Sequence, residues 1–252
     1  MIARERSISF SRLYGAACFT LLFSVAMALS LPAPAQRIVA EAEIFLRGKL
    51  IKPAVGQWAT YSLHDKATGN DYMLRLSIVG SERIGSMTAW WVETDTWPAK
   101  GRGRRSIKKL LVVDDSSNVA NIKKMVFKIG YAPAYEAPVE PMQAAASTDP
   151  TVRTVKTLGE EEITAAGTQF KTEKVALIID EQRSELWISP KLHLTGVVKA
   201  ACPSGTFTLV QYASEGARSA IRQMPGGQPD SIMKKDFATQ KELDALMKAQ
   251  ER

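Results

Sequence analysis

The sequence is poor in the residues that build most metal and redox sites, with two cysteines and two histidines among 252 residues. His64 and His193 are far apart, and neither has a second ligand at the spacing of a zinc motif. We therefore expect no metal site. Cys18 lies within a predicted leader, so Cys202 is expected to have no disulfide partner in its own chain. Because Cys202 follows an apolar stretch, we interpret it as a buried thiol.

The sequence also lacks the motifs of catalysis. There is no G-x-S-x-G elbow for a serine nucleophile. Gly101-x-Gly103 is not followed by the Lys-Ser/Thr pair of a phosphate-binding loop. The carboxylates of Glu160, Glu161 and Glu162 would alternate between the faces of a strand, so they make no acid pair. We therefore predict a non-enzymatic protein with no catalytic residue and no cofactor.

No apolar run is long enough for a typical membrane span. The longest, from Ala16 to Leu31, has about 16 residues, whereas a spanning helix needs roughly 20. Arg4, Arg6 and Arg12 precede this run, and the small-residue site Ala33-Pro34-Ala35 follows it. That order is typical of a secretory signal peptide over residues 1–35, with export to the periplasm. An uncleaved membrane anchor is the alternative.

The chain has few acidic residues relative to basic ones, with a formal net charge of +7. A basic surface outside the cytoplasm favours contact with anionic lipid and makes a nucleic acid an unexpected partner. The basic stretch that contains Arg102, Arg104 and Arg105 is our candidate for contacts with anionic headgroups. A solvated loop is the alternative interpretation of these arginines.

Hydrophobic periodicity predicts a mainly β protein. Apolar residues at helical spacing predict a helix over residues 37–50. Residues 121–130 fit either a helix or a strand, and residues 131–150, which contain four prolines, predict an irregular connection. A capping box predicts a C-terminal helix at 239–250. Antiparallel strands are expected at 56–63, 72–79, 88–96, 107–113, 152–163, 168–179, 184–189, 195–201 and 205–213. We therefore expect one β domain over residues 36–222, followed by a loop and a helix over 223–252.

Alternation places Leu74, Leu76 and Ile78 on the inner face of one strand. Ser77 points the other way, where an added charge is expected to be tolerated. Trp90 and Trp91 must point to opposite faces, and the sequence does not say which of them points inward. Seven residues are candidates for the lining of a hydrophobic cavity or a filled core: Trp58, Leu74, Leu76, Ile78, Trp91, Phe170 and Trp187.

Four segments resemble strands of secreted bacterial proteins related to the outer-membrane lipoprotein-carrier fold. They are Gly56–Tyr61 (GQWATY), Ala166–Thr172 (AGTQFKT), Glu185–Pro190 (ELWISP) and Thr195–Lys199 (TGVVK). This resemblance implies a strongly curved antiparallel sheet, or incomplete β-barrel, around a hydrophobic cavity. The helix at 37–50 would then be one of its covers.

The resemblance and the absence of catalytic groups favour a periplasmic protein that binds a lipid or an acylated partner. Handling of outer-membrane lipoproteins or lipids is the role that the resemblance implies. The alternative is a structural or interaction subunit of a cell-envelope assembly, with a filled core and a protein partner. The sequence identifies neither the ligand nor the partner.

The leader generates a testable prediction. Signal peptidase recognises small side chains such as those of Ala33 and Ala35, so the exported protein should begin at Gln36. N-terminal sequencing of the exported protein measures this directly. An intact Met1 in a membrane fraction would instead support the uncleaved anchor.

Overall fold

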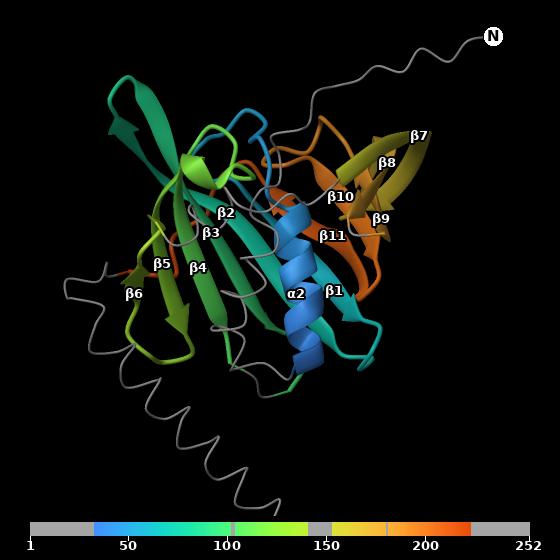
Figure 1. The fold of residues 1–252 in the computed structure, drawn as a ribbon, viewed down its shortest axis with the longest axis horizontal. Coiled ribbons are helices and arrows are strands. Elements are labelled where there is room, and N and C mark those ends of the chain that lie inside the picture. Colours follow the sequence, from blue (N-terminus) through green and yellow to red (C-terminus); the bar gives the residue numbers. More distant parts are fainter. Residues whose placement is uncertain (1–32, 102–103, 141–152, 180, 223–252) are drawn as a thin grey trace, which may run out of the picture.

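A computed structural model describes residues 33–101, 104–140, 153–179 and 181–222 of the protein (Figure 1). Most of the predicted signal peptide, the predicted C-terminal helix at 239–250, Arg102 and residues 141–152 lie outside this part of the chain. The elements within it are one α-helix, one short 3-10 helix and eleven strands. They are α2 (Ala33–Phe45), β1 (Trp58–Asp65), β2 (Asp71–Ile84), β3 (Met87–Pro98), β4 (Ser106–Val113), η2 (Val119–Asn121), β5 (Ile122–Ile129), β6 (Tyr135–Ala137), β7 (Arg153–Ala165), β8 (Thr168–Ile179), β9 (Gln182–Ile188), β10 (Val197–Cys202) and β11 (Gly205–Ala213).

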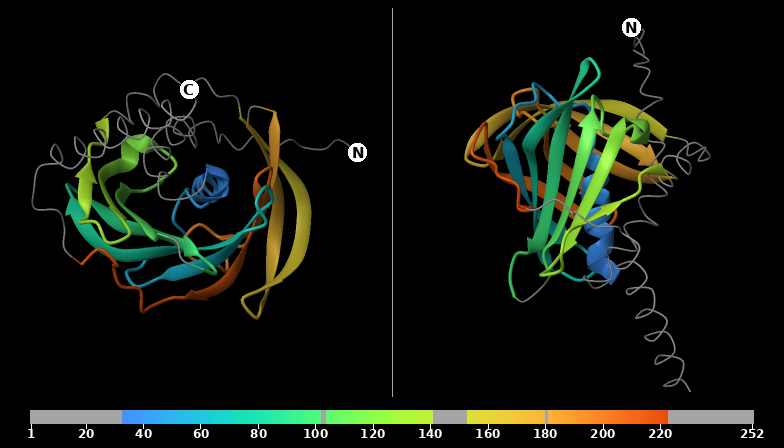
Figure 2. Two further views of the ribbon diagram at one scale, coloured as in Figure 1. Left: turned by 90° about the horizontal axis from the view of Figure 1, so that it is seen from below. Right: turned by 90° about the vertical axis from the view of Figure 1, so that its left-hand side faces the viewer.

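All the described strands belong to one antiparallel sheet, in the order β6-β5-β4-β3-β2-β1-β11-β10-β9-β8-β7. The chain runs from the middle strand β1 outward to the edge strand β6, and then resumes at the opposite edge with β7. From there it returns strand by strand until β11 pairs with β1. We call β2–β6 the first arm and β7–β11 the second arm. The two edges β6 and β7 do not pair, so the sheet stays open and curves around α2 (Figure 2).

The predicted mainly β fold, with a strongly curved antiparallel sheet and an N-terminal helix, is confirmed. The ambiguous residues 121–130 form strand β5 after one turn of 3-10 helix. The expected irregular connection contains the three-residue strand β6. The helix predicted to end at residue 50 ends at Phe45. The apolar residue Leu50 follows the helix and is nevertheless buried, which made the pattern look longer than the helix is.

A two-residue turn sets the register of the hairpin β7–β8. Ala166 and Gly167 both have positive φ, at 50° and 69°. Two residues with positive φ make the tight turn whose twist matches that of the paired strands. Twelve residue pairs then follow along the hairpin, with one irregularity between Thr157 and Gly159.

The two faces of the sheet carry separate apolar clusters. On β4, Leu110 and Val112 belong to the large cluster, whereas Leu111 and Val113 belong to the small one. Because neighbouring side chains on a strand point to opposite faces, the clusters lie on opposite sides of the sheet. The large cluster includes α2 and lies on the concave face. The small cluster therefore lies on the convex face.

Part of the convex face is covered by residues 214–222, which we call the convex strap. Its backbone joins the sheet through the bond from Ala217 N to Gly56 O, at 2.8 Å. The carboxylate of Glu93 in β3 accepts bonds from Ser219 Oγ at 2.6 Å and from Ala220 N at 2.9 Å. Ile221 completes the small apolar cluster. The strap therefore buries this part of the outer face, although alternation alone predicts that it faces solvent.

The strap changes what is expected of Ser77. Ser77 is only 5% exposed, and it lies opposite Glu93 in the pairing of β2 with β3. A new carboxylate there would be desolvated and close to a like charge, so Ser77→Asp should lower the free energy of unfolding by roughly 3 kcal/mol. The expectation that a charge is tolerated at Ser77 was wrong, because it took the outer face to be open.

The matched control is Ser81→Asp, at an exposed position of the same strand. This change should cost less than about 0.5 kcal/mol. Urea denaturation of both variants measures the difference. Equal stability of the two variants would contradict the covered outer face.

Candidate functional site

The candidate site is the concave face of the sheet together with α2, which lies inside the curve (Figure 2). Ile38, Ala42, Phe45 and Leu46 recur at the spacing of one helix face. All four are buried against the sheet. The N-terminal helix expected from the sequence therefore covers the concave face, as the resemblance implied.

An aromatic cluster joins α2 to the middle of the sheet. Phe45 of α2 stacks on Phe207 of β11, with ring centroids 6.1 Å apart. Tyr61 of β1 meets Phe207 edge to face at 5.8 Å, and its hydroxyl donates to Val197 O at 2.9 Å. Burial raises the pKa of Tyr61, so this hydroxyl stays protonated. These ring contacts set how closely the helix packs against β1 and β11.

Two carboxylates of α2 anchor the helix to the two arms. Residues two apart on a helix are separated by about 200°, so Glu41 and Glu43 point to opposite sides. Glu41 Oε2 accepts bonds from the backbone N and the hydroxyl of Ser204, in the turn between β10 and β11. Glu43 forms an ion pair with Lys108 of β4. The helix therefore bridges the second arm and the first arm through charged groups.

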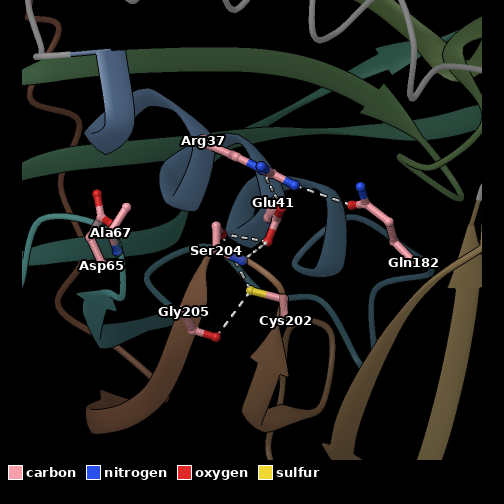
Figure 3. A network of polar contacts seen from close by, with 8 residues as sticks. All are labelled: Arg37, Glu41, Asp65, Ala67, Gln182, Cys202, Ser204 and Gly205. Atoms are coloured by element: carbon pink, nitrogen blue, oxygen red, sulfur yellow. Dashed lines mark hydrogen bonds and ion pairs between the residues drawn. The ribbon is translucent and has the colours of Figure 1, made fainter.

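The anchor of Glu41 extends further along the second arm (Figure 3). Arg37 Nε donates to Glu41 Oε1 at 3.3 Å, and Arg37 Nη2 donates to Gln182 Oε1 at 3.3 Å. Gln182 begins β9. One network of side chains thus joins α2 to both the β10–β11 turn and β9.

The pair of Glu43 and Lys108 is largely withdrawn from water, with side-chain exposures of 14% and 8%. Desolvation lowers the pKa of Lys108 to about 7. A buried ammonium group is tolerated only where a partner compensates for its lost hydration. Glu43 is that partner. The position of α2 on the sheet therefore depends on this charged contact as well as on the apolar face of the helix.

Cys202 lies in the same network, and its thiol is free and buried. Its Sγ donates to Gly205 O at 3.3 Å and lies 3.7 Å from Ser204 Oγ. Burial and the neighbouring Glu41 raise the pKa of the thiol to about 12. A thiol that is protonated at neutral pH is not an attacking group. The expectation of a buried thiol at Cys202 is confirmed.

Four of the predicted lining residues do meet on the concave face. Leu74, Leu76, Ile78 and Phe170 all belong to the large apolar cluster, and none is more than 3% exposed. Leu74, Leu76 and Ile78 come from the first arm and Phe170 comes from the second arm. The tertiary structure therefore brings together residues that are about a hundred positions apart in the sequence.

The three predicted tryptophans do not belong to the large cluster, although Trp91 and Trp187 are buried. Trp91 belongs to the small cluster, while Trp90 packs against the large one. Trp58 and Trp187 flank the concave residues Ala59 and Leu186 on their strands, so both face outward. Apolarity alone suggested an inward position, whereas both faces of this sheet hold large side chains.

Each outward tryptophan lies beside a cation and donates its indole N–H. Trp58 lies 3.9 Å from the Arg75 guanidinium and donates to Glu215 O at 3.1 Å. Cation–π contacts of this kind stabilise a large ring at a surface. Trp91 lies beside the ammonium group of Lys109 and donates its N–H to Glu82. Trp187 lies between the ammonium groups of Lys174 and Lys199, and it donates its N–H to Glu161.

Arg104 and Arg105 of the basic stretch are both exposed, and Arg105 is also paired with a carboxylate. Arg105 binds Asp95 with two nitrogen atoms, and its ring contact is with Trp97 at 6.0 Å. The hydrogen bond with Asp95 raises the pKa of Arg105 further. Arg104 is exposed. A headgroup contact remains a prediction for Arg102, Arg104 and Arg105, and at Arg105 an anionic headgroup would share the guanidinium with Asp95.

Both histidines have side-chain partners. His64 Nδ1 lies 2.9 Å from Asp71 Oδ1, and His193 Nδ1 lies 3.0 Å from Gln57 Nε2. Within the described ranges, no three His, Cys, Asp or Glu side chains are grouped as a metal site would require. The same part of the chain has no helix with the length and apolar character needed to cross a bilayer.

The anchoring residues Glu41, Glu43, Lys108 and Ser204 were not among the sequence-predicted site residues. The one available signal was the pair of carboxylates, Glu41 and Glu43, within a largely apolar helix. Lys108 is in a strand whose other residues are mostly apolar, but nothing local identifies its partner. The pairing depends on how α2 crosses the sheet, which is a tertiary property.

No family model and no curated protein matches the chain by sequence. The resemblance to the lipoprotein-carrier fold therefore remains a prediction.

Solved structures give weak likenesses. One is a protein of Bacteroides fragilis with a YmcC-like fold, thought to be exported, with a TM-score of 0.37 and 10% identity over 66% of this chain and 100% of that one. Another is a protein of Parabacteroides distasonis thought to be a lipoprotein, with a TM-score of 0.34 and 11% identity over 66% of this chain and 99% of that one. The complex of MucA and MucB from Pseudomonas aeruginosa gives a TM-score of 0.34 and 16% identity, over 77% of this chain and 60% of that one. With TM-scores this low, the likenesses carry no argument about function.

The buried thiol generates a prediction about reactivity. Because the pKa of Cys202 is about 12 in the folded protein, the thiolate is scarce at pH 8. Native protein should therefore react very slowly with a soluble alkylating reagent, and urea-unfolded protein should react rapidly. Mass spectrometry of the labelled chain measures both rates. Rapid stoichiometric labelling of native protein would contradict the buried network around Cys202.

The ion pair generates a second prediction. Lys108→Met leaves the carboxylate of Glu43 without its partner, and should lower the free energy of unfolding by roughly 3 kcal/mol. The double variant Glu43→Gln/Lys108→Met should recover most of that loss, because neither uncompensated charge remains. Denaturant unfolding of the single and double variants gives the coupling energy.

Lys123→Met, at an exposed position of β5, is the control and should change stability by less than about 0.5 kcal/mol. Additive effects of the Glu43 and Lys108 substitutions would show that the pair does not anchor the helix.

Proposed function

We propose that the protein is a non-enzymatic protein of the bacterial periplasm that binds an acyl chain at its concave face, beneath α2. The acyl chain belongs to a lipid or to an acylated partner such as an outer-membrane lipoprotein. One observation carries this proposal: the cover of a large apolar face is a single 13-residue helix. Among the described residues, α2 makes no backbone hydrogen bond to the sheet and is held by side chains.

Magnitudes support an exchange between α2 and an acyl chain. Burying Ile38, Phe45 and Leu46 contributes about 1.5–3 kcal/mol for each side chain. An acyl chain contributes about 0.8 kcal/mol for each buried CH₂, so roughly ten carbons match the apolar contacts of the helix. A chain of ordinary lipid length is therefore a sufficient competitor for the concave face.

The polar contacts of α2 would set the rate of such an exchange. Opening the cover requires separation of Glu41 from Ser204 and of Glu43 from Lys108. Both contacts can be replaced by water, whereas the apolar face needs an apolar substitute. This asymmetry supports an acyl chain, rather than a polar ligand, as the occupant.

A second candidate is an interaction subunit of an envelope assembly with a permanently filled core. The observation that favours it is the completeness of the packing, since Ile38 and Ala42 of α2 are 0% exposed. In this alternative, α2 is a fixed part of the core and a protein partner binds elsewhere.

Binding of a fluorescent fatty acid to the exported protein separates the two candidates. Glu41→Gln weakens the anchor at Ser204 and should accelerate probe association by about tenfold if α2 must move, because about 1.4 kcal/mol of barrier corresponds to tenfold in rate. Glu136→Gln, at an exposed site of β6, is the matched control and should leave the rate unchanged. Stopped-flow fluorescence measures both rates.

Native mass spectrometry of protein isolated from its own periplasm should in addition reveal a bound acyl-chain lipid. A wild-type protein that binds no probe and carries no lipid would contradict the proposal. In that case a co-purifying protein would support the filled-core alternative.

A further inference from the structure

The inner face of the strand pair β3–β4 is apolar along one half and polar along the other. Trp90 and Val92 of β3 lie opposite Val112 and Leu110 of β4, and all four belong to the large apolar cluster or pack against it. Every second residue of a strand lies on the same face. The residues that continue this inner face are Thr94 and Thr96 of β3 and Ser106 and Lys108 of β4. The concave face of the first arm is therefore amphipathic along its length, with one ammonium group in its polar half.

The sheet itself supplies no anion to Lys108. The cross-strand neighbours of Lys108 are Thr94 in β3 and Phe127 in β5, and neither carries a charge. The carboxylate that pairs with Lys108 is that of Glu43, which belongs to α2. The charge of Lys108 is therefore compensated by the cover of the concave face, and this compensation is lost when the cover moves away.

The neighbouring Lys109 is placed differently. It faces the convex side, where its ammonium group lies 4.9 Å from the ring centroid of Trp91. In the register of β3 with β4, Lys109 lies opposite Glu93. A carboxylate of the sheet thus accompanies Lys109 whatever the position of α2, which makes Lys108 the lysine of this strand that depends on the helix.

This dependence adds a charge requirement to the exchange of α2 for an acyl chain. Water solvates Lys108 while the concave face is open. An occupant that covers the face as α2 does excludes this water, and a buried ammonium group without an anion is strongly unfavourable. A neutral acyl chain would replace the apolar contacts of the helix but leave Lys108 uncompensated. An acyl chain that ends in a carboxylate would replace both kinds of contact.

We propose that the ligand of the concave face is a long-chain fatty acid whose carboxylate takes the place of Glu43 beside Lys108. Its chain lies over the apolar half of the inner face, and its head group lies over the polar half. A carboxylate is the group that Lys108 already binds, and α2 offers the same combination of an apolar surface and one carboxylate. This inference rests on the proposed function, because it names the ligand that displaces the helix.

The second anchor of α2 has no such requirement. Glu41 accepts hydrogen bonds from the backbone N and the hydroxyl of Ser204, and both of these donors are neutral. Water replaces a carboxylate on neutral donors at little cost. The head group of the ligand is therefore expected at Lys108 in the first arm, and not at Ser204 in the second arm.

The experiment compares two fluorescent probes with the same acyl chain, a fatty acid and its methyl ester, by equilibrium titration of the full exported protein. Desolvation lowers the pKa of Lys108 to about 7, so the titrations are carried out at pH 6, where the ammonium form predominates. The carboxyl group of a fatty acid resembles that of glutamic acid and is ionised at this pH. The wild-type protein should bind the acid at least about tenfold more tightly than the ester, because hydrogen bonds between charged groups are among the strongest.

Three variants assign this preference to Lys108. Glu43→Gln/Lys108→Met removes both charges of the buried pair, and its ratio of acid to ester affinity should fall to about one. Glu43→Gln alone retains Lys108 and should retain the preference, so that the loss in the double variant is assigned to the lysine. Lys123→Met removes a positive charge at an exposed position of β5 and should bind both probes as the wild-type protein does. Circular dichroism verifies that each variant is folded.

The outcomes separate this inference from the proposed function. Equal affinity of the wild-type protein for the acid and the ester would overturn the inference and leave the acyl site standing. A preference for the acid that persists in the folded double variant would place the head group elsewhere and would also overturn it. A wild-type protein that binds neither probe would overturn both the inference and the proposed function.

Discussion

The structure depends on one constraint, which is that the apolar side chains on both faces of an open, curved sheet must be kept from water. A closed barrel would seal its own interior, but β6 and β7 do not pair here. The concave face is covered by α2, and part of the convex face is covered by the strap at residues 214–222. Both covers are attached to a sheet that continues without interruption from one edge to the other.

The two covers are held by similar chemistry. Glu41 and Glu43 anchor α2, and Glu93 anchors the strap through Ser219 and Ala220. A carboxylate that accepts hydrogen bonds in a partly dry site makes stronger and more directional contacts than apolar packing does. The directional carboxylate contacts therefore define the position of each cover. The more numerous apolar contacts supply most of the free energy that holds the cover on the sheet. This division of roles supports the proposed exchange of α2 with an acyl chain.

The placement of the tryptophans follows from the same constraint. Trp58, Trp91 and Trp187 lie on the outer face, where each meets a cation and donates its N–H to an oxygen. An indole ring has one polar group, and at a surface that group can reach a carboxylate or a carbonyl. The inner face instead holds Tyr61, Phe170 and Phe207, together with aliphatic residues.

The sequence by itself determined the class of fold and most of its strands, because alternation and turn residues are local properties. Alternation placed Leu74, Leu76 and Ile78 on one inner face for the same reason. The sequence did not determine the three-residue strand β6, whose signal is too short, or the end of α2 at Phe45. Only the tertiary structure decided which tryptophan of a neighbouring pair faces inward, since both faces of the sheet are covered. Only the path of α2 across the sheet brings Glu43 to Lys108, because two residues 65 positions apart become partners through packing and not through any local pattern.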